Sequence, residues 1–304
     1  MSVQVFELVF DQRYIIDGNR IAGSLIEGAV VIVSNVGLRG RELVVELRGE
    51  AKNSWVNKVS DKIYENFESY LNDHVVLLSH ADAIPPGRQD IPFRYQLPPS
   101  LPSSFEGEFG QIRYTARAIL RSPETGETIA ADRVFNVVDR VDLGLKPITK
   151  HPVEIEDRTD FACCCIPLGA VTAIITDIPI TAEIHNGSRK DIKDATISLI
   201  QLAEFTAKSR YENAEDRKEM SYVLATIEKG NIESHRTLRI HSEALHIPNS
   251  VIPSLPQGII SVNYMLRFEA RPGIEIEIPI TVGTINSLSR PEHAPRRTAV
   301  AYAD

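Results

Sequence analysis

The chain has 304 residues, a formal net charge of −8 and a pI of about 5.6. This length suits two domains of roughly 150 residues each, and 24% charged with 43% hydrophobic residues is the composition of an ordinary soluble globular protein. The acidic balance argues against nucleic-acid binding, which requires a basic face.

The first residues, MSVQVFELVF, show no secretory signal pattern before Asp11. The most apolar stretch, residues 161–175, is shorter than the roughly 20 residues that span a bilayer. It is also interrupted by Pro167 and Gly169, so we interpret it as buried strand. The three cysteines are adjacent and poorly placed to pair, which favours a reducing compartment.

Alternation of apolar and polar residues with the period of a strand recurs along the chain, in residues 41–48, 112–120, 177–185, 259–270 and 273–282. Half-buried strands between glycine and proline turns favour antiparallel sandwiches over a parallel α/β sheet. A G-x-G-x-x-G unit, which would support the parallel alternative, does not occur.

Residues 91–120 read as two strands joined by a proline-rich corner and a glycine turn. Pro98, Pro99 and Pro102 end the first strand because proline cannot donate to a ladder. We predict that Gly107 and Gly110 supply the positive φ angles of a tight re-entry.

Phe105, at the same corner, is predicted to fill the edge of a sandwich core. Glu106 is predicted to face outward or to cap a backbone donor. On this reading, replacement of Phe105 by alanine costs about 3–5 kcal/mol through a core cavity.

Residues 211–220 are charged but lack an apolar helical stripe, so we predict a solvated loop between strands. The glycine and proline content of residues 141–152 predicts a linker. It divides the chain into a first sandwich at residues 1–140 and a second at residues 153–288. A disordered tail is predicted at residues 289–304.

Catalytic and metal-binding patterns are weak in this sequence. His235, His241 and His246 fit alternating strand positions and not a ligand set. Glu275 and Glu277 lie opposite an isoleucine row and therefore read as solvent-facing, not as a general acid/base pair. We expect no enzyme activity, cofactor or metal.

The cysteines at Cys163, Cys164 and Cys165 admit several readings. A zinc site needs about four separated ligands, lipidation is conceivable beside an apolar run, and a mixed disulfide needs an exposed low-pKa thiolate. Burial of the cysteines as small hydrophobic side chains is the commoner arrangement and is favoured. Asn186-Gly187-Ser188 matches a glycosylation acceptor, which we discount without a secretory signal.

The residue order Pro-Ser-Ser-Phe-Glu-Gly at 102–107, followed by Ile-Arg-Tyr at 112–114, resembles the amino-terminal domain of arrestin-domain proteins, in particular the α-arrestin group. Further segments that resemble family motifs follow in order: Gly18, Ile21, Gly23 and Leu25; residues 48–51 with Trp55; Cys163 to Cys165 with Gly169; and residues 184–188 (IHNGS), 245–248 (LHIP), 261–266 (SVNYML) and 278–284 (IPITVGT).

This resemblance implies an all-β protein of two immunoglobulin-like antiparallel sandwiches in tandem. It implies a cytosolic adaptor, recruited to the plasma membrane or endosomes, that binds the cytosolic tails of membrane proteins and helps sort or internalise them without catalysis. The family-motif residues are assigned structural roles: Trp55, Pro102, Phe105, Gly107, Gly110, Tyr114, Asn186, Pro248, Tyr264, Pro279 and Gly283.

Three departures qualify the resemblance. No Pro-Pro-x-Tyr motif occurs, so direct recruitment of ubiquitin ligases is not implied, and any link to ligases or endocytic machinery would be indirect. The family's Gly-Tyr-x-Pro-Gly-Glu turn does not fit between residues 169 and 184. The first strand region offers only Arg13 where receptor-class arrestins carry a lysine pair.

Two other functions stay open. One is a thiol-dependent redox or metabolic regulator of the thioredoxin-interacting type, acting through the cysteine cluster. The other is a non-catalytic scaffold without ligase recruitment. Arg290, Arg296 and Arg297 make the tail locally basic, which allows weak attraction to anionic lipid or a solvated terminus.

Overall fold

The computed structural model describes residues 3–12, 18–79, 81–122, 126–142, 153–158, 163–168, 177–248, 251–271 and 274–284. Every regular element within these ranges is a β-strand. The same residues contain no helix long and apolar enough to cross a membrane. The predicted all-β class is confirmed.

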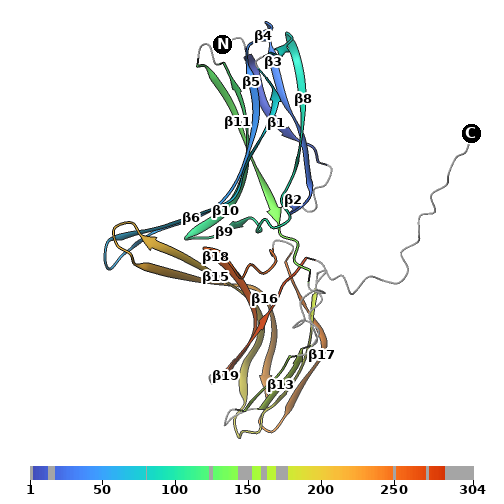
Figure 1. The fold of residues 1–304 in the computed structure, drawn as a ribbon. Coiled ribbons are helices and arrows are strands. Elements are labelled where there is room, and N and C mark those ends of the chain that lie inside the picture. Colours follow the sequence, from blue (N-terminus) through green and yellow to red (C-terminus); the bar gives the residue numbers. More distant parts are fainter. Residues whose placement is uncertain are drawn as a thin grey trace, which may run out of the picture.

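The first sandwich packs a three-stranded sheet, in the order β1-β3-β8, against part of a larger sheet (Figure 1). Its strands are β1 (Val3–Phe10), β2 (Asn19–Ile21), β3 (Leu25–Ser34), β4 (Leu38–Arg39), β5 (Glu42–Asn57), β6 (Lys62–Leu78), β7 (Ala83–Ile84), β8 (Gly87–Gln96), β9 (Phe105–Glu106), β10 (Gly110–Arg121) and β11 (Thr128–Val138).

The second sandwich contains a four-stranded sheet in the order β12-β13-β14-β17, and β15, β16, β18 and β19 form its other sheet. Its strands are β12 (Val153–Arg158), β13 (Cys163–Leu168), β14 (Asp177–His185), β15 (Ile192–Ser209), β16 (Glu215–Ile232), β17 (Thr237–His246), β18 (Ile260–Arg271) and β19 (Ile274–Ile280).

One sheet of each sandwich is continuous with the other, which the sequence did not predict. β6 pairs with β15 at Glu65↔Lys208 and Tyr64↔Ser209, so ten strands form one hydrogen-bonded sheet across both domains. Figure 1 shows the β5–β6 and β15–β16 hairpins reaching outward side by side from the junction. We call this junction, where β6 meets β15, the domain seam.

The two-residue period of β10 accounts for how it builds the core. Ile112, Tyr114, Ala116, Ala118 and Leu120 are fully buried, whereas Arg113 and Arg117 between them face solvent. Since successive strand side chains point to opposite faces, this alternation commits one face to the sandwich interior.

The loop predicted at residues 211–220 is wrong from Glu215 onward, where β16 begins. β16 pairs with β15 from Lys208↔Glu215 to Ile192↔Ile232. Its burial alternates, with Asp216 and Lys218 half-buried between exposed neighbours. The charged residues that suggested a loop lie on the solvent-facing side of a long edge strand.

Several expectations lie outside the described residues. They comprise residues 143–152 of the predicted linker, the position of the missing turn in residues 169–176, Arg13, and the tail at residues 289–304 with its three arginines. The domain boundaries therefore stay predictions.

Asn186 lies between β14 and β15 and is fully buried. Its amide donates to the carbonyl oxygens of Lys190, Ile232 and Glu233 at 2.8, 3.0 and 3.1 Å. Its Oδ1 accepts from the Ser188 hydroxyl at 2.7 Å. Asn186 thus ties the β14–β15 turn to the end of β16, which argues further against glycosylation there.

We expect Asn186→Ala to lower the free energy of unfolding by about 2 kcal/mol, because it leaves buried carbonyl groups without donors. Chemical denaturation measures this directly. Asn213→Ala, an exposed position in the β15–β16 turn, is the control and should change stability by less than about 0.5 kcal/mol. Equal midpoints for the two variants would contradict the structural role of Asn186.

Candidate interaction site at the domain seam

An aromatic cluster from both sandwiches forms the centre of the domain seam. Phe205 of β15 lies 6.1 Å from the Phe105 ring and 5.8 Å from the Phe109 ring, measured between centroids. Trp55 packs edge-on to Phe109 at 5.9 Å. Phe105 is 8% exposed, so its predicted burial is confirmed, but its aromatic partner belongs to the second domain.

Polar side chains fix the same junction. Buried Asn53 donates from its amide to the carbonyls of Thr206 and Ile259 at 3.0 and 2.8 Å. The Trp55 indole donates to Asp216 at 2.9 Å, and this bond holds the pKa of the Asp216 carboxyl below its ordinary value. Two side chains of β5 thereby hold three acceptor groups of the second domain, the carbonyls of Thr206 and Ile259 and the carboxylate of Asp216.

Gly107 and Gly110 are required by close approach and not by positive φ, so the predicted reason was wrong. Neither is among the described residues with positive φ. A Cβ on Gly107 would lie 2.6 Å from the Phe205 ring. A Cβ on Gly110 would lie 1.9 Å from Asn53 Oδ1 and 2.8 Å from the Lys52 carbonyl oxygen. Because glycine has no Cβ, the backbone at both positions can approach the side chains of the seam closely.

The same hydrogen-bonding device occurs in both sandwiches, 150 residues apart. The buried Tyr114 hydroxyl donates to the Pro102 carbonyl at 2.7 Å, and the Tyr264 hydroxyl donates to the Ile252 carbonyl at 2.7 Å. Both bonds span 12 residues, and burial raises the pKa of Tyr264 to about 12.

Two serines complete this repeated device. The Ser104 amide donates to the Val137 carbonyl while the Val137 amide donates to Ser104 Oγ. Ser254 and Val282 exchange the same pair of bonds. Each sandwich therefore anchors its corner segment by a tyrosine and a serine, and the serines are again 150 residues apart. Low side-chain identity around these positions hid the repeat from sequence inspection.

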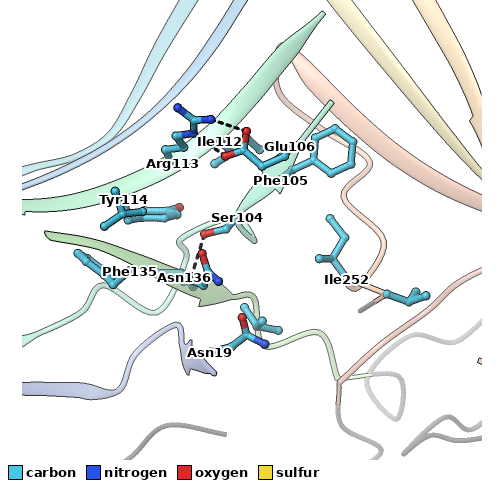
Figure 2. A pocket seen from close by; sticks show the side chains of 14 residues that line it. Asn19, Ser104, Phe105, Glu106, Ile112, Arg113, Tyr114, Phe135, Asn136 and Ile252 are labelled. Atoms are coloured by element: carbon cyan, nitrogen blue, oxygen red, sulfur yellow. Dashed lines mark hydrogen bonds and ion pairs between the residues drawn. The ribbon is translucent and has the colours of Figure 1, made fainter. Parts of the chain in front are cut away.

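A cavity of about 470 Å³ lies beside the seam, where these two corner segments face each other (Figure 2). Its buried floor comes from Ile112, Tyr114 and Phe135 of the first domain. Val251 and Ile252 line it from the second domain. Both domains must hold their positions for this cavity to exist.

The rim of the cavity is polar. Arg113 binds both carboxylate oxygens of Glu106, at 2.5 and 2.8 Å, which raises the pKa of the guanidinium group. Asn136 is exposed beside Val134, which is 63% exposed. An apolar floor with a polar rim is the usual composition of a site that binds a small ligand or a peptide side chain.

The remaining sequence-predicted residues lie away from the cavity. Pro248 follows β17, Pro279 is exposed on β19, and Gly283 is buried after β19. His241 and His246 are exposed on β17, as the strand alternation predicts, whereas His235 lies in the turn before β17 and not on a strand. The described residues hold no group of three histidine, cysteine or acidic side chains able to bind a metal.

The cysteine cluster lies on β13, an inner strand of the four-stranded sheet. Cys163, Cys164 and Cys165 pair with residues of β12 on one side and of β14 on the other. The cluster lies in a different sheet from the seam, and the side chains of these residues lie outside what the structure describes.

Comparison with known proteins identifies both halves of the chain. The family model for the arrestin (or S-antigen) N-terminal domain matches residues 6–144, and the model for the C-terminal domain matches residues 174–287.

Curated relatives cover most of the chain. Arrestin domain-containing protein 17 of Caenorhabditis elegans is 30% identical over 315 aligned positions, 94% of this chain and 71% of that protein. Arrestin domain-containing protein 15 of the same organism is 29% identical, over 78% of this chain and 68% of that protein. Arrestin domain-containing protein 1 of Rattus norvegicus is 26% identical, over 93% of this chain and 65% of that protein.

Proposed function

Because the chain belongs to the arrestin-domain-containing protein family, we propose that it is a cytosolic adaptor in membrane-protein trafficking. In this role it binds the cytosolic tails of receptors or transporters and helps to sort or internalise them. It acts by binding and not by catalysis, in the cytoplasm and, on recruitment, at the plasma membrane or endosomes.

The observation that carries this proposal is the cavity built from both domains. Above the buried floor, half-buried Val251 and Ile252 and exposed Val134 offer apolar surface to a bound side chain. Extended peptides commonly bind such concave surfaces, with main-chain contacts giving affinity and a pocket giving specificity. A cytosolic tail is a flexible chain of this kind.

The seam explains how such a site remains formed without a ligand. The β6–β15 pairing, the Phe205 cluster and the Asn53 bonds fix one domain against the other. A site that is already formed spends less of its interaction energy on ordering. The chain contains no Pro-Pro-x-Tyr motif, so any link to ubiquitin ligases would be indirect.

We expect proximity labelling by the full chain in intact cells to enrich membrane transporters or receptors together with endosomal proteins. Val134→Glu, at the cavity rim, should reduce this enrichment several-fold, because a carboxylate there opposes apolar docking. Val36→Glu, a similarly exposed valine outside the cavity, is the matched control.

The outcomes separate the two parts of the proposal. If the unmodified chain enriches no membrane proteins, the trafficking role is wrong. If the chain enriches them and Val134→Glu matches Val36→Glu, the adaptor role stands but the cavity is not the binding site.

A further inference from the structure

The outer face of the second domain's sheet, formed by β16, β15, β18 and β19, has an apolar row across its middle. Val223, Ile200, Met265 and Pro279 are cross-strand neighbours in that order. Val223 is 64% exposed, Met265 is half-buried and Pro279 is exposed, whereas Ile200 on the central strand is 1% exposed. No described strand packs on this face, since the second domain's other sheet covers the opposite one.

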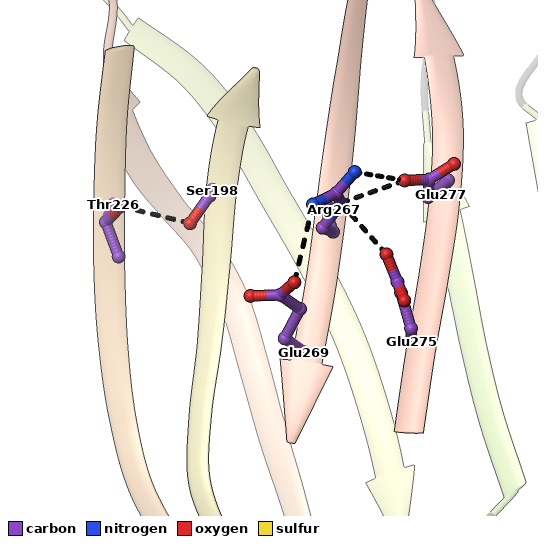
Figure 3. Close-up of polar contacts among 6 residues, drawn as sticks. All are labelled: Ser198, Thr226, Arg267, Glu269, Glu275 and Glu277. Carbon is purple, nitrogen blue, oxygen red and sulfur yellow. Dashed lines mark hydrogen bonds and ion pairs between the residues drawn. The ribbon is translucent and has the colours of Figure 1, made fainter. Parts of the chain in front are cut away.

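Acidic residues lie on one side of the apolar row. Figure 3 shows three of them, Glu269, Glu275 and Glu277, around Arg267. Glu269 of β18 is directly opposite Glu275 of β19. On its other side Glu269 is opposite Thr196 of β15, which in turn is opposite Glu228 of β16, so the three glutamates lie in one row across the sheet. Arg267, one row closer to the apolar residues, contacts Glu277 at 2.5 Å, Glu275 at 3.2 Å and Glu269 at 3.5 Å. A single guanidinium group is therefore shared by three carboxylates.

A second acidic row flanks the apolar row on its other side. Glu204 of β15 is directly opposite Glu219 of β16. Arg217 reaches Glu204 at 3.4 Å, but it also contacts Glu215 at 3.2 Å. Arg267 and Arg217 thus contact five carboxylates between them (Glu204, Glu215, Glu269, Glu275 and Glu277), and Glu219 and Glu228 add two more acidic side chains to the same rows.

Stability does not account for this arrangement. Like charges directly opposite one another on a sheet are destabilising, and this face contains two such pairs, Glu269↔Glu275 and Glu204↔Glu219. Val223, Met265 and Pro279 offer apolar surface between two charged rows, and apolar surface inside a charged rim is the anatomy of a protein interface. The potential of the rim selects partners of opposite charge.

We propose that this face docks a segment of a partner protein whose apolar side chains are flanked on both sides by lysine or arginine. The rows at Thr196 and Glu204 lie four residues on either side of Ile200, which is roughly 13 Å along a strand. If the partner's cations lie about that far from the middle of its apolar segment, in each direction, each group of cations meets one acidic row. The partner's apolar side chains then cover Val223 and Met265. An anionic lipid surface is disfavoured because the carboxylates repel it.

The proposal goes beyond the adaptor function because this face is separate from the seam cavity. It can be tested on the purified full chain with a synthetic peptide of four leucines between two groups of three lysines. Fluorescence anisotropy would measure its Kd at low and high salt. A peptide with serine in place of leucine tests the apolar contribution, and anionic vesicles test lipid as the alternative partner.

We expect Glu219→Gln combined with Glu269→Gln and Glu275→Gln to raise the Kd at least about tenfold, because it removes the opposed carboxylates. The charge-matched control combines Glu7→Gln, Asp61→Asn and Glu108→Gln, all exposed positions in the first domain. It should change the Kd by less than about twofold, and both triple variants should melt near the unmodified chain.

Val223→Ser should weaken binding, whereas Val76→Ser, a similarly exposed valine on β6, should not. An equal loss for the two charge variants, or equal affinity of the leucine and serine peptides, would show a general charge effect and overturn the proposal. Binding of anionic vesicles that Val223→Ser weakens and Val76→Ser leaves unchanged would replace the partner with lipid. Failure of the peptide to bind leaves the trafficking test unaffected and refutes this inference alone.

Discussion

Replacement of Phe105 by alanine is expected to lower the free energy of unfolding by about 3–5 kcal/mol, the usual cost of removing a buried phenylalanine. Its ring is 8% exposed and contacts Phe205 across the domain seam. The substitution should therefore destabilise both domains, because Phe205 of β15 in the second domain loses the aromatic ring that it packs against. Denaturant unfolding followed by tryptophan fluorescence reports the seam directly, since Trp55 is the chain's one tryptophan.

Phe67→Ala is the matched control for this measurement. Phe67 lies on β6 near the same junction but is 56% exposed, with Lys52 over its ring. Its loss should cost less than about 1 kcal/mol. If the two variants unfold at the same denaturant concentration, Phe105 does not hold the seam as its contacts indicate.

Much of the fold could be predicted from the sequence because the chain alternates on a period of two. The row from Ile112 to Leu120 and three isoleucines of β19 (Ile274, Ile276 and Ile278) are buried where that period places them. β16 escaped prediction because its apolar side chains, such as Met220 and Tyr222, are only half-buried, and its first six residues are mostly charged.

The seam was harder to predict because its contacts join residues far apart in sequence. The sequence motif identifies Phe105 and Gly107, but it predicts that both act within the first sandwich, Phe105 in the core and Gly107 in a turn. Phe205, which contacts both, is about a hundred positions away. Its strand, β15, has the same alternation of apolar and polar residues as other strands, so nothing in the sequence marks Phe205 as a contact between domains. Close approach of a glycine to a distant side chain leaves no local signal, whereas a positive φ in a turn often does.

The repeated tyrosine device shows a similar limit. Tyr114 and Tyr264 bond to carbonyls, and a carbonyl belongs to every residue type, so Pro102 and Ile252 share a role without sharing a side chain. Such a repeat is conserved in backbone geometry and becomes visible only with coordinates.

Gly110→Ala is expected to destabilise the protein by about 3 kcal/mol, at the upper end of ordinary overpacking. The new methyl group would lie 1.9 Å from Asn53 Oδ1 and 2.8 Å from a backbone oxygen, and the backbone cannot move away cheaply. Asn53 can relieve the clash only by rotating, which breaks its bonds to Thr206 and Ile259 of the second domain. The variant therefore has one of two consequences: either β10 is strained, or Asn53 rotates and the seam loosens.

Small-angle scattering and hydrogen exchange distinguish these two responses. A loosened seam should raise the radius of gyration and speed amide exchange in β6 and β15, whereas strain confined to β10 should leave the domain arrangement unchanged. Gly187→Ala is the control, because its added methyl group would meet its nearest neighbour, the His185 ring, at 3.8 Å. Equal stability of the two variants would mean that the Gly110 approach to Asn53 does not position the domains.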